Sequence, residues 1–200
     1  MNQPRIHIRW YATGDFIAAV IAWICFYFAR KTIIGELPHV GNKFYLGLIL
    51  YPLAWITLYH LGGCYKNIYL KSRLIEFINT FNYSFLGSIL ILFLFILYDA
   101  PGDYSIYYKE FFSLWGIQVA VTFIIRLFFL TAAKKQLENG RVFFNTLIIG
   151  SSKNAASLYN TIVNNKENPG YRVSGFINTN GNPANELPTA ITNFGNTENI

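Results

Sequence analysis

The sequence predicts a bundle of four transmembrane helices followed by the first part of an α/β domain. Hydrophobic residues make up 53% of the 200 residues and the mean hydropathy is +0.31. Charged residues make up only 13%, compared with about 25% in typical soluble domains. So few charged residues cannot cover the whole surface of a protein in water, which indicates that part of the surface contacts lipid. After residue 133, apolar residues occur only in short runs, which indicates a separate, non-membrane region.

Four apolar segments have the length of about 20 residues that spans roughly 30 Å of hydrocarbon. In chain order they are Trp10–Ala29, Phe44–Leu61, Phe77–Tyr98 and Phe111–Ala133. Aromatic residues cluster at their ends, as at membrane interfaces. Pro52 predicts a kink in the second helix. We therefore assign residues 1–133 to a four-helix transmembrane region.

Two charges interrupt these apolar segments, Asp15 in the first and Arg126 in the fourth. They could form an ion pair between the two helices or act as two independent interfacial anchors. We favour anchoring, because both lie near the same expected headgroup level, where charge is inexpensive. His60 is interpreted as interfacial, since no second His or carboxylate stands at helical spacing from it. Cys25 and Cys64 fall near opposite faces of the bilayer, so both are expected to be free thiols that serve packing.

The Lys and Arg residues near the segment ends indicate the orientation. Seven of them fall on one side, namely Arg5, Arg9, Lys66, Lys71, Arg73, Lys134 and Lys135. Four fall on the other, namely Arg30, Lys31, Lys43 and Lys109. This asymmetry predicts that both termini lie in the cytoplasm. Because the basic residues are scattered, the net charge of +6 does not indicate nucleic-acid binding.

Residues 134–200 have the pattern of a βαβ unit, which predicts a parallel sheet. Lys134–Gly140 continues the fourth helix, and the predicted strand, helix and strand follow at Val142–Ile149, Asn154–Asn164 and Tyr171–Ile177. A turn at 168–170 and a loop at 178–183 complete the unit. Because a doubly wound domain needs about 100 residues or more, we expect only its first half here, in a truncated Rossmann-like domain of a longer protein.

The turn after the first predicted strand resembles part of a dinucleotide fingerprint. Gly150, Ser151, Ser152 and Asn154 are the candidate cofactor-binding residues, at a helix amino terminus that could receive a phosphate. However, Ser152 replaces the middle glycine and Asn178 stands where an acid would hold the ribose. We therefore favour an ordinary sheet-to-helix turn and expect no tight NAD binding.

The sequence contains no recognisable catalytic or metal-binding set. All three His precede residue 61, and the region after residue 133 has no Asp and only scattered Glu. Nucleophilic triads and Mg²⁺ sites both need such groups close together. We therefore predict no catalytic residues, no metal ligands and no cofactor within this chain.

Four stretches together resemble polyprenyl glycosylphosphotransferases, the undecaprenyl-phosphate sugar phosphotransferase family. They are LGGCYKN at Leu61–Asn67, NTLIIGSSKNAASLYNTI, NPGYRVSGFIN and LPTAITNFGNTENI, the last resembling the start of the family's next helix. The resemblance covers nearly the whole chain and implies four membrane helices followed by a Rossmann-like, CoA-binding-like domain. The family often has an acid where this sequence has Asn178.

The resemblance implies a role in starting capsule, exopolysaccharide or O-antigen synthesis at the bacterial inner membrane. Such enzymes transfer a sugar-1-phosphate from a nucleotide-diphosphate sugar to undecaprenyl phosphate. Their catalytic Asp–Glu pair and Mg²⁺ site lie in a carboxyl-terminal domain, and no position here matches that motif. The chain would then be the membrane-anchoring and regulatory part, inactive alone. Its partners would be the lipid bilayer and, through the missing domain, polyprenyl phosphate and the nucleotide sugar, with homo-oligomerisation left open.

Two alternatives remain. Membrane-bound nucleotide-sugar 4,6-dehydratases share the same front half, although they more often keep a glycine-rich turn where this chain has LIIGSSKNA. A non-catalytic membrane scaffold is the third hypothesis. The sequence that follows Ile200 in the gene distinguishes the three.

Overall fold

The computed structural model of the chain describes residues 6–98, 104–164, 170–179 and 191–196. These residues form two compact units, one of residues 6–132 and one within residues 133–200. The first is entirely helical apart from its connections, and the second contains a small parallel sheet. The predicted combination of membrane-type helices and a parallel α/β element is confirmed.

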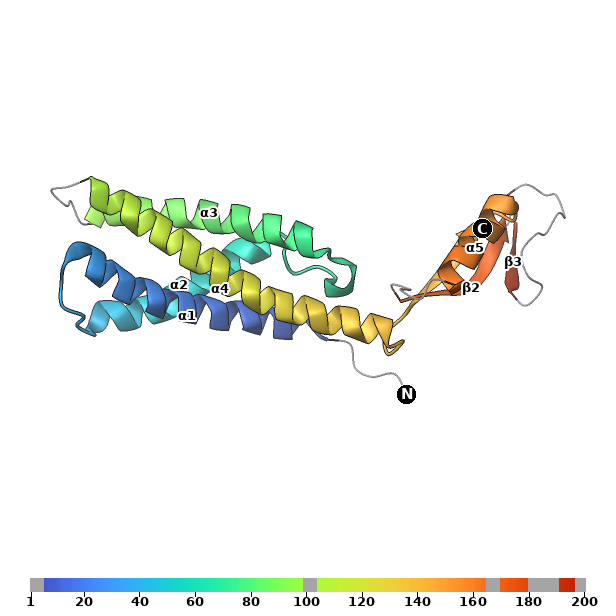
Figure 1. Cartoon of the computed structure of the whole chain (residues 1–200), viewed down its shortest axis with the longest axis horizontal. Helices are drawn as coiled ribbons and strands as arrows, with labels where there is room; N and C mark the ends of the chain where they lie inside the picture. Colours follow the sequence, from blue (N-terminus) through green and yellow to red (C-terminus); the bar gives the residue numbers. More distant parts are fainter. Residues whose placement is uncertain (1–5, 99–103, 165–169, 180–190, 197–200) are drawn as a thin grey trace. The chain divides into compact units, whose positions relative to one another are not determined.

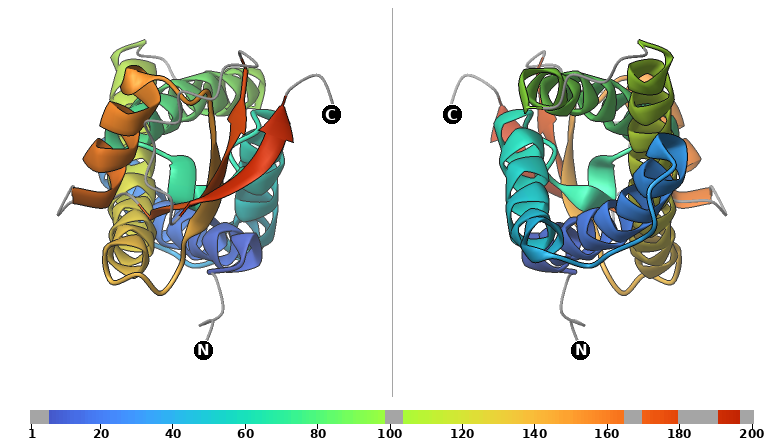
Figure 2. Two further views of the ribbon diagram at one scale, coloured as in Figure 1. Left: turned by 90° about the vertical axis from the view of Figure 1, so that its right-hand side faces the viewer. Right: turned by 90° about the vertical axis from the view of Figure 1, so that its left-hand side faces the viewer.

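The first unit is built from four long helices that run alternately up and down (Figure 1). They are α1 (Ile8–Ile34), α2 (Asn42–Leu61), α3 (Arg73–Tyr98) and α4 (Ser105–Glu138). All four are long and apolar enough to cross a membrane, which confirms the predicted number of spans. Viewed along the bundle, they occupy four sides in the order α1, α2, α3, α4 (Figure 2). The starts of α1 and α3 and the end of α2 lie at one end, hereafter the amino-terminal end.

The helices extend beyond the apolar segments from which they were predicted. α4 forms one helix of 34 residues and begins at Ser105, six positions before the predicted segment Phe111–Ala133. Residues 99–103 lie outside the described part. α1 continues to Ile34 and ends at Gly35, whose φ of 77° closes the helix in the left-handed conformation. An apolar run in the sequence marks only the part of a helix that would lie in hydrocarbon, whereas the capping residues determine where the helix ends.

Small residues let α1 and α2 pack closely, as is common between membrane helices. Ala18, Ala19 and Ala22 of α1 are fully buried. At Gly47 of α2, even a methyl group would clash with the indole of Trp23. That indole is held in place, because its Nε1 donates a hydrogen bond to the carbonyl oxygen of Phe44 at 3.1 Å.

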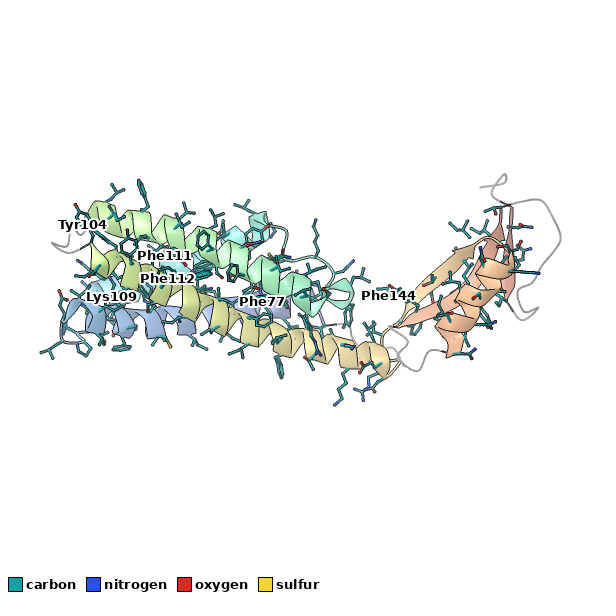
Figure 3. The ribbon with its side chains drawn as sticks, turned by 45° about the horizontal axis from the view of Figure 1, so that its top comes forward. Phe77, Tyr104, Lys109, Phe111, Phe112 and Phe144 are labelled. Atoms are coloured by element: carbon teal, nitrogen blue, oxygen red, sulfur yellow. The ribbon has the colours of Figure 1, made fainter. Side chains whose placement is uncertain are left out.

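Aromatic rings fill the contact between α3 and α4. Phe77 meets Phe123, Phe81 meets Trp115 and Phe85 meets Phe111, with ring centroids 4.9, 4.8 and 5.6 Å apart. The three α3 residues are four apart in sequence and therefore share one face of the helix. We call these three pairs the aromatic ladder. Phe77 and Phe111 lie towards opposite ends of the bundle (Figure 3).

The second unit contains the predicted βαβ arrangement. β1 (Phe144–Ile149), α5 (Lys153–Asn164) and β2 (Tyr171–Asn178) are followed by β3 (Thr192–Asn196). The strands are all parallel, in the order β1-β2-β3. α5 packs through Ala155 onto Ile148 of β1 and Phe176 of β2.

β3 was not predicted. The sequence suggested that a helix begins at about Gly195, but Gly195 and Asn196 belong to this strand, and residues 197–200 lie outside the described part. Asn and Gly have low strand propensity, so the segment TNFGN carries little local signal. Pairing with β2, for example of Gly175 with Thr192, creates the strand.

Candidate functional site

A cluster of buried charges joins the four membrane-type helices near the amino-terminal end. Arg126 of α4 forms a two-pronged ion pair with Asp15 of α1, with Nε–Oδ1 at 2.9 Å and Nη2–Oδ2 at 2.7 Å. Its Nη1 donates to Glu76 Oε1 of α3 at 2.8 Å and to Thr80 Oγ1 at 3.0 Å. Its Cζ lies 4.2 Å from the ring centroid of Tyr59 on α2. One guanidinium therefore contacts all four helices.

Two further side chains complete this charge cluster around Glu76. Lys71 Nζ lies 2.8 Å from Glu76 Oε2, and the Tyr11 hydroxyl donates to Glu76 Oε1 at 2.7 Å. Two carboxylates thus face two cations, and the formal charge of the cluster is zero. Asp15, Glu76 and Arg126 are each at most 1% exposed.

The burial of Asp15 and Arg126 corrects the prediction that they are independent interfacial anchors. They form the inter-helix ion pair that was the less favoured alternative. Burying single charges is costly in an apolar medium, whereas pairing each carboxylate with a cation offsets much of that cost. The prediction failed because Glu76 and Lys71 lie outside the apolar segments, so the sequence did not show that four charges converge.

Polar side chains continue from the charge cluster through the interior of the bundle. Glu76, Thr80, Ser84 and Ser88 are spaced by four along α3 and are fully buried. This spacing places them on one helix face, opposite Gln118 and Thr122 of α4, which are also fully buried. We call this set, with Tyr51 and Tyr59 of α2, the polar seam. The interior is therefore more polar than the surface, where large apolar side chains are exposed on all four helices.

Gln118 links the polar seam to α2. Its Oε1 accepts a hydrogen bond from the Tyr51 hydroxyl at 2.9 Å, and its Nε2 donates to Thr122 Oγ1 at 2.9 Å and to the Tyr59 hydroxyl at 3.4 Å. The Tyr59 hydroxyl also lies 3.3 Å from Ser84 Oγ. In hydrocarbon, such hydrogen bonds determine which helix faces meet, because water is absent there and cannot hydrogen-bond to an unpaired polar group.

The connection between α2 and α3 covers the charge cluster. It contains η1 (Ile68–Leu70), and Cys64 and Ile68 are buried in it. Lys71 Nζ donates to the carbonyl oxygen of Cys64, and the Tyr83 hydroxyl donates to that of Gly62 at 2.9 Å. Burial raises the pKa of the Cys64 thiol above its ordinary value. Much of the LGGCYKN stretch thus serves as a folded cover over the charges.

The predicted phosphate-binding residues form one turn of the second unit. Gly150, Ser151 and Ser152 connect β1 to α5, and Asn154 lies in the first turn of α5. Gly150 has a φ of 114°, which requires glycine there. Ser151 Oγ donates to Asn178 Oδ1 at 3.0 Å, so the turn is tied to the end of β2. Ser152 and Asn154 are exposed.

This contact shows what one of the two sequence departures, Asn178, does in the structure. Asn178 stands at the carboxyl end of β2, the place of a ribose-binding acid, and its amide oxygen is engaged by Ser151. The Ser151 hydroxyl and the Asn178 amide oxygen are therefore engaged with each other. The amino terminus of α5, where Lys153 is exposed, is the feature that favours an anion.

Sequence reasoning missed most of the buried polar set. Glu76, Lys71, Gln118 and the hydroxyls of Tyr51 and Tyr59 were not singled out. A signal was present, because polar residues recur every four positions in α3 as Glu, Thr, Ser and Ser, and in α4 as Gln, Thr and Arg. Thr and Ser lower the mean hydropathy of a helix only slightly, so a search for apolar segments does not reveal this pattern.

The charge cluster does not offer free acid, base or nucleophile. Both Asp15 oxygens and Glu76 Oε1 accept hydrogen bonds, and Glu76 Oε2 pairs with Lys71. Within the described residues no three His, Cys, Asp or Glu side chains group to hold a metal ion. His60 is exposed and faces the Tyr65 ring at 6.2 Å between centroids. The cluster fixes helices rather than positioning a reacting group.

Comparisons with protein-family models, with characterised proteins and with solved structures found no match for this chain.

Proposed function

We propose that this chain is the membrane-anchoring and regulatory part of a bacterial sugar-phosphate transferase. In this proposal the bundle lies in the inner membrane with both termini in the cytoplasm, and the α/β unit is a Rossmann-like module. The activity it supports is transfer of a sugar-1-phosphate from a nucleotide-diphosphate sugar to undecaprenyl phosphate. The four stretches that resemble polyprenyl glycosylphosphotransferases, from LGGCYKN to the one that ends in GNTENI, suggest this role.

One observation carries the proposal furthest. The neutral charge cluster joins the helices of the bundle, and the LGGCYKN connection covers this cluster. The bundle is followed in the chain by a βαβ unit with parallel strands. In this proposal the described residues are an anchor and a small folded module. The catalytic step is assigned to a separate domain, because no position of this sequence matches the catalytic motif of the family it resembles.

The test deletes the bundle from the protein, in the organism that carries the gene. Codons 6–132 are deleted in frame, and isolated membranes receive a radiolabelled nucleotide sugar. We expect label in extracted polyprenyl lipid to fall several-fold, while a strain with the lipid-facing substitution Ile124→Ala keeps it. Unchanged transfer would contradict the proposal. Loss of a 4-keto nucleotide sugar with transfer intact would favour the dehydratase alternative.

A further inference from the structure

Asn82 is a polar side chain on the outer face of α3, opposite the polar seam. The buried residues Thr80 and Ser84 lie two positions before and after it, which is about 200° around a helix. Asn82 itself is exposed. Because α3 forms one side of the four-helix bundle, this face points away from the other three helices (Figure 2). The Asn82 amide therefore faces whatever surrounds the bundle.

The position of Asn82 along α3 lies well inside the candidate membrane span. Measured along the helix axis, Asn82 is about 14 Å from Arg73 and about 24 Å from Tyr98. A hydrocarbon layer of about 30 Å centred on α3 therefore contains this side chain. Long lysine and arginine side chains can carry their charge from such a depth towards the headgroups, but an asparagine side chain is too short to do so.

The Asn82 amide makes no hydrogen bond within the part of the chain that the structure describes. The exposed hydroxyls of Thr13 and Thr57 differ, because each donates to a carbonyl oxygen of its own helix at 2.8 Å. The two donors and the acceptor of an amide are costly to leave unpaired in hydrocarbon, where water is absent. An acyl chain has no hydrogen-bonding group to offer. Asn82 thus requires a polar partner from outside the bundle.

Asn82 belongs to a seven-residue repeat of exposed side chains. The members of this repeat on α3 are Ile75, Asn82, Ile89 and Ile96. Apolar residues with this period form the seam between two helices that wind around each other, and a single asparagine in such a seam sets the register of the pair. Between residues 75 and 97 the sequence has one charge, Glu76, which lies in the buried charge cluster. Two copies of this face can therefore meet without repulsion between like charges.

A second copy of the chain supplies the matching polar group at the right depth. All copies of a membrane protein insert with the same orientation, so two α3 helices related by a two-fold axis along the membrane normal are parallel. Their Asn82 side chains then lie at the same level. A primary amide contains both donors and an acceptor, so two identical amides satisfy each other. An unrelated helix would need a polar group at this level, whereas a second copy always has one.

We propose that the exposed face of α3 is a homodimer interface in which the two Asn82 amides hydrogen-bond to each other across a two-fold axis. The isoleucines of the seven-residue repeat pack against their counterparts on either side of that amide pair. The interface uses α3 alone, so it does not depend on the transferase role proposed for the chain.

The test measures association of the full chain in lipid. Chains labelled at the carboxyl terminus with a donor or an acceptor dye are reconstituted together in phosphatidylcholine–phosphatidylglycerol vesicles, and energy transfer is followed as the protein-to-lipid ratio falls. We expect a monomer–dimer equilibrium that Asn82→Leu weakens about tenfold, because two hydrogen bonds between helices are lost. Asn82→Gln keeps the amide and should dimerise more tightly than Asn82→Leu. The control Thr57→Val removes an exposed hydroxyl that is bonded to its own helix, and should dimerise as the wild type does.

A second measurement identifies the face and the partner in native membranes. In a Cys25→Ser background, Ile89→Cys should form a disulfide-linked dimer on mild oxidation, and adding Asn82→Leu should reduce the yield. Ile124→Cys, exposed on α4, should not cross-link, and neither should the background, because its remaining Cys64 is buried. A wild type that stays monomeric at every protein-to-lipid ratio, equal association of Asn82→Leu and wild type, or cross-linking of Ile89→Cys to a different protein would overturn the proposal.

Discussion

Arg126 shows how one side chain can define a membrane bundle. Its flat guanidinium presents several donors in fixed directions, so it binds both oxygens of Asp15 while still reaching Glu76 and Thr80. A lysine at this position would offer one point charge and could not satisfy these acceptors together. The partners come from α1 and α3, and the Tyr59 ring of α2 covers one face.

Replacing Arg126 should destabilise the bundle strongly. Arg126→Gln leaves Asp15 buried without a cation and Glu76 with only Lys71, which should lower the free energy of unfolding by about 3–5 kcal/mol. Thermal or denaturant unfolding in detergent micelles measures the change. Arg73→Gln is the matched control, since Arg73 is exposed at the same end of the bundle. Similar losses for both variants would show that the cluster is not the stabilising feature.

The buried Cys64 thiol should react slowly with alkylating reagents. Its raised pKa keeps it protonated at pH 8, and the connection covers it. In a Cys25→Ser background, iodoacetamide incorporation followed by mass spectrometry should be at least about tenfold slower than in denatured protein. Because only the unfolded thiol ionises readily, this group also makes stability fall as the pH rises through the thiol's ordinary range. Equal alkylation of folded and denatured chains would refute the assignment.

Each face of α3 contacts a different environment. Its buried face carries the residues of the polar seam, its next face carries the aromatic ladder, and its remaining face exposes aliphatic side chains such as Leu86 and Leu90. This division follows from helical periodicity, because residues four apart share a face. The helix therefore has polar, aromatic and lipid-facing sides although it is apolar enough overall to cross a membrane.

Two glycines in helices should respond oppositely to the same substitution. Gly47→Ala introduces a methyl group against the Trp23 indole, which its hydrogen bond to Phe44 holds in place, and should cost about 1–3 kcal/mol. Gly116→Ala adds a methyl group into open space on α4 and should be neutral or stabilise by up to about 1 kcal/mol. Unfolding of both variants in the same detergent provides the measurement. A stable Gly47→Ala variant would show that α1 and α2 do not pack this closely.

The elements were predictable to different degrees. The four long helices follow from apolar runs, because hydrophobic length is a local property. The βαβ order was equally readable from Val142–Ile149, Asn154–Asn164 and Tyr171–Ile177. β3 was not, because a strand of Thr, Asn and Gly depends on its neighbour for its hydrogen bonds.

At the scale of the whole molecule, the two units have different interiors. The helical unit encloses charge and exposes large apolar side chains, whereas the α/β unit buries Ile148 and Phe176 in a small apolar core. The first arrangement is the one expected of helices surrounded by lipid. The low overall charge thus describes the membrane part correctly, and asparagine supplies much of the polarity after residue 133.

The orientation of the bundle in the membrane gives a prediction for the whole chain. The four candidate spans and the seven-to-four asymmetry of Lys and Arg near their ends predict that both termini lie in the cytoplasm. Green fluorescent protein fused after Ile200 should therefore fluoresce, and alkaline phosphatase inserted between Leu37 and Gly41 should be active outside the cytoplasm. The opposite pair of results would reverse the orientation.

The sequence by itself determined the four helices that are long and apolar enough to cross a membrane and the order β1, α5, β2 of the α/β unit. These depend on composition and short-range periodicity. Only the tertiary structure decided that Asp15, Glu76 and Arg126 meet, since they come from three helices and lie up to 111 positions apart. It also decided that Asn82 lies on the outer face of α3. Burial of paired charges and exposure of a helix face are properties of several helices together, which no local pattern specifies.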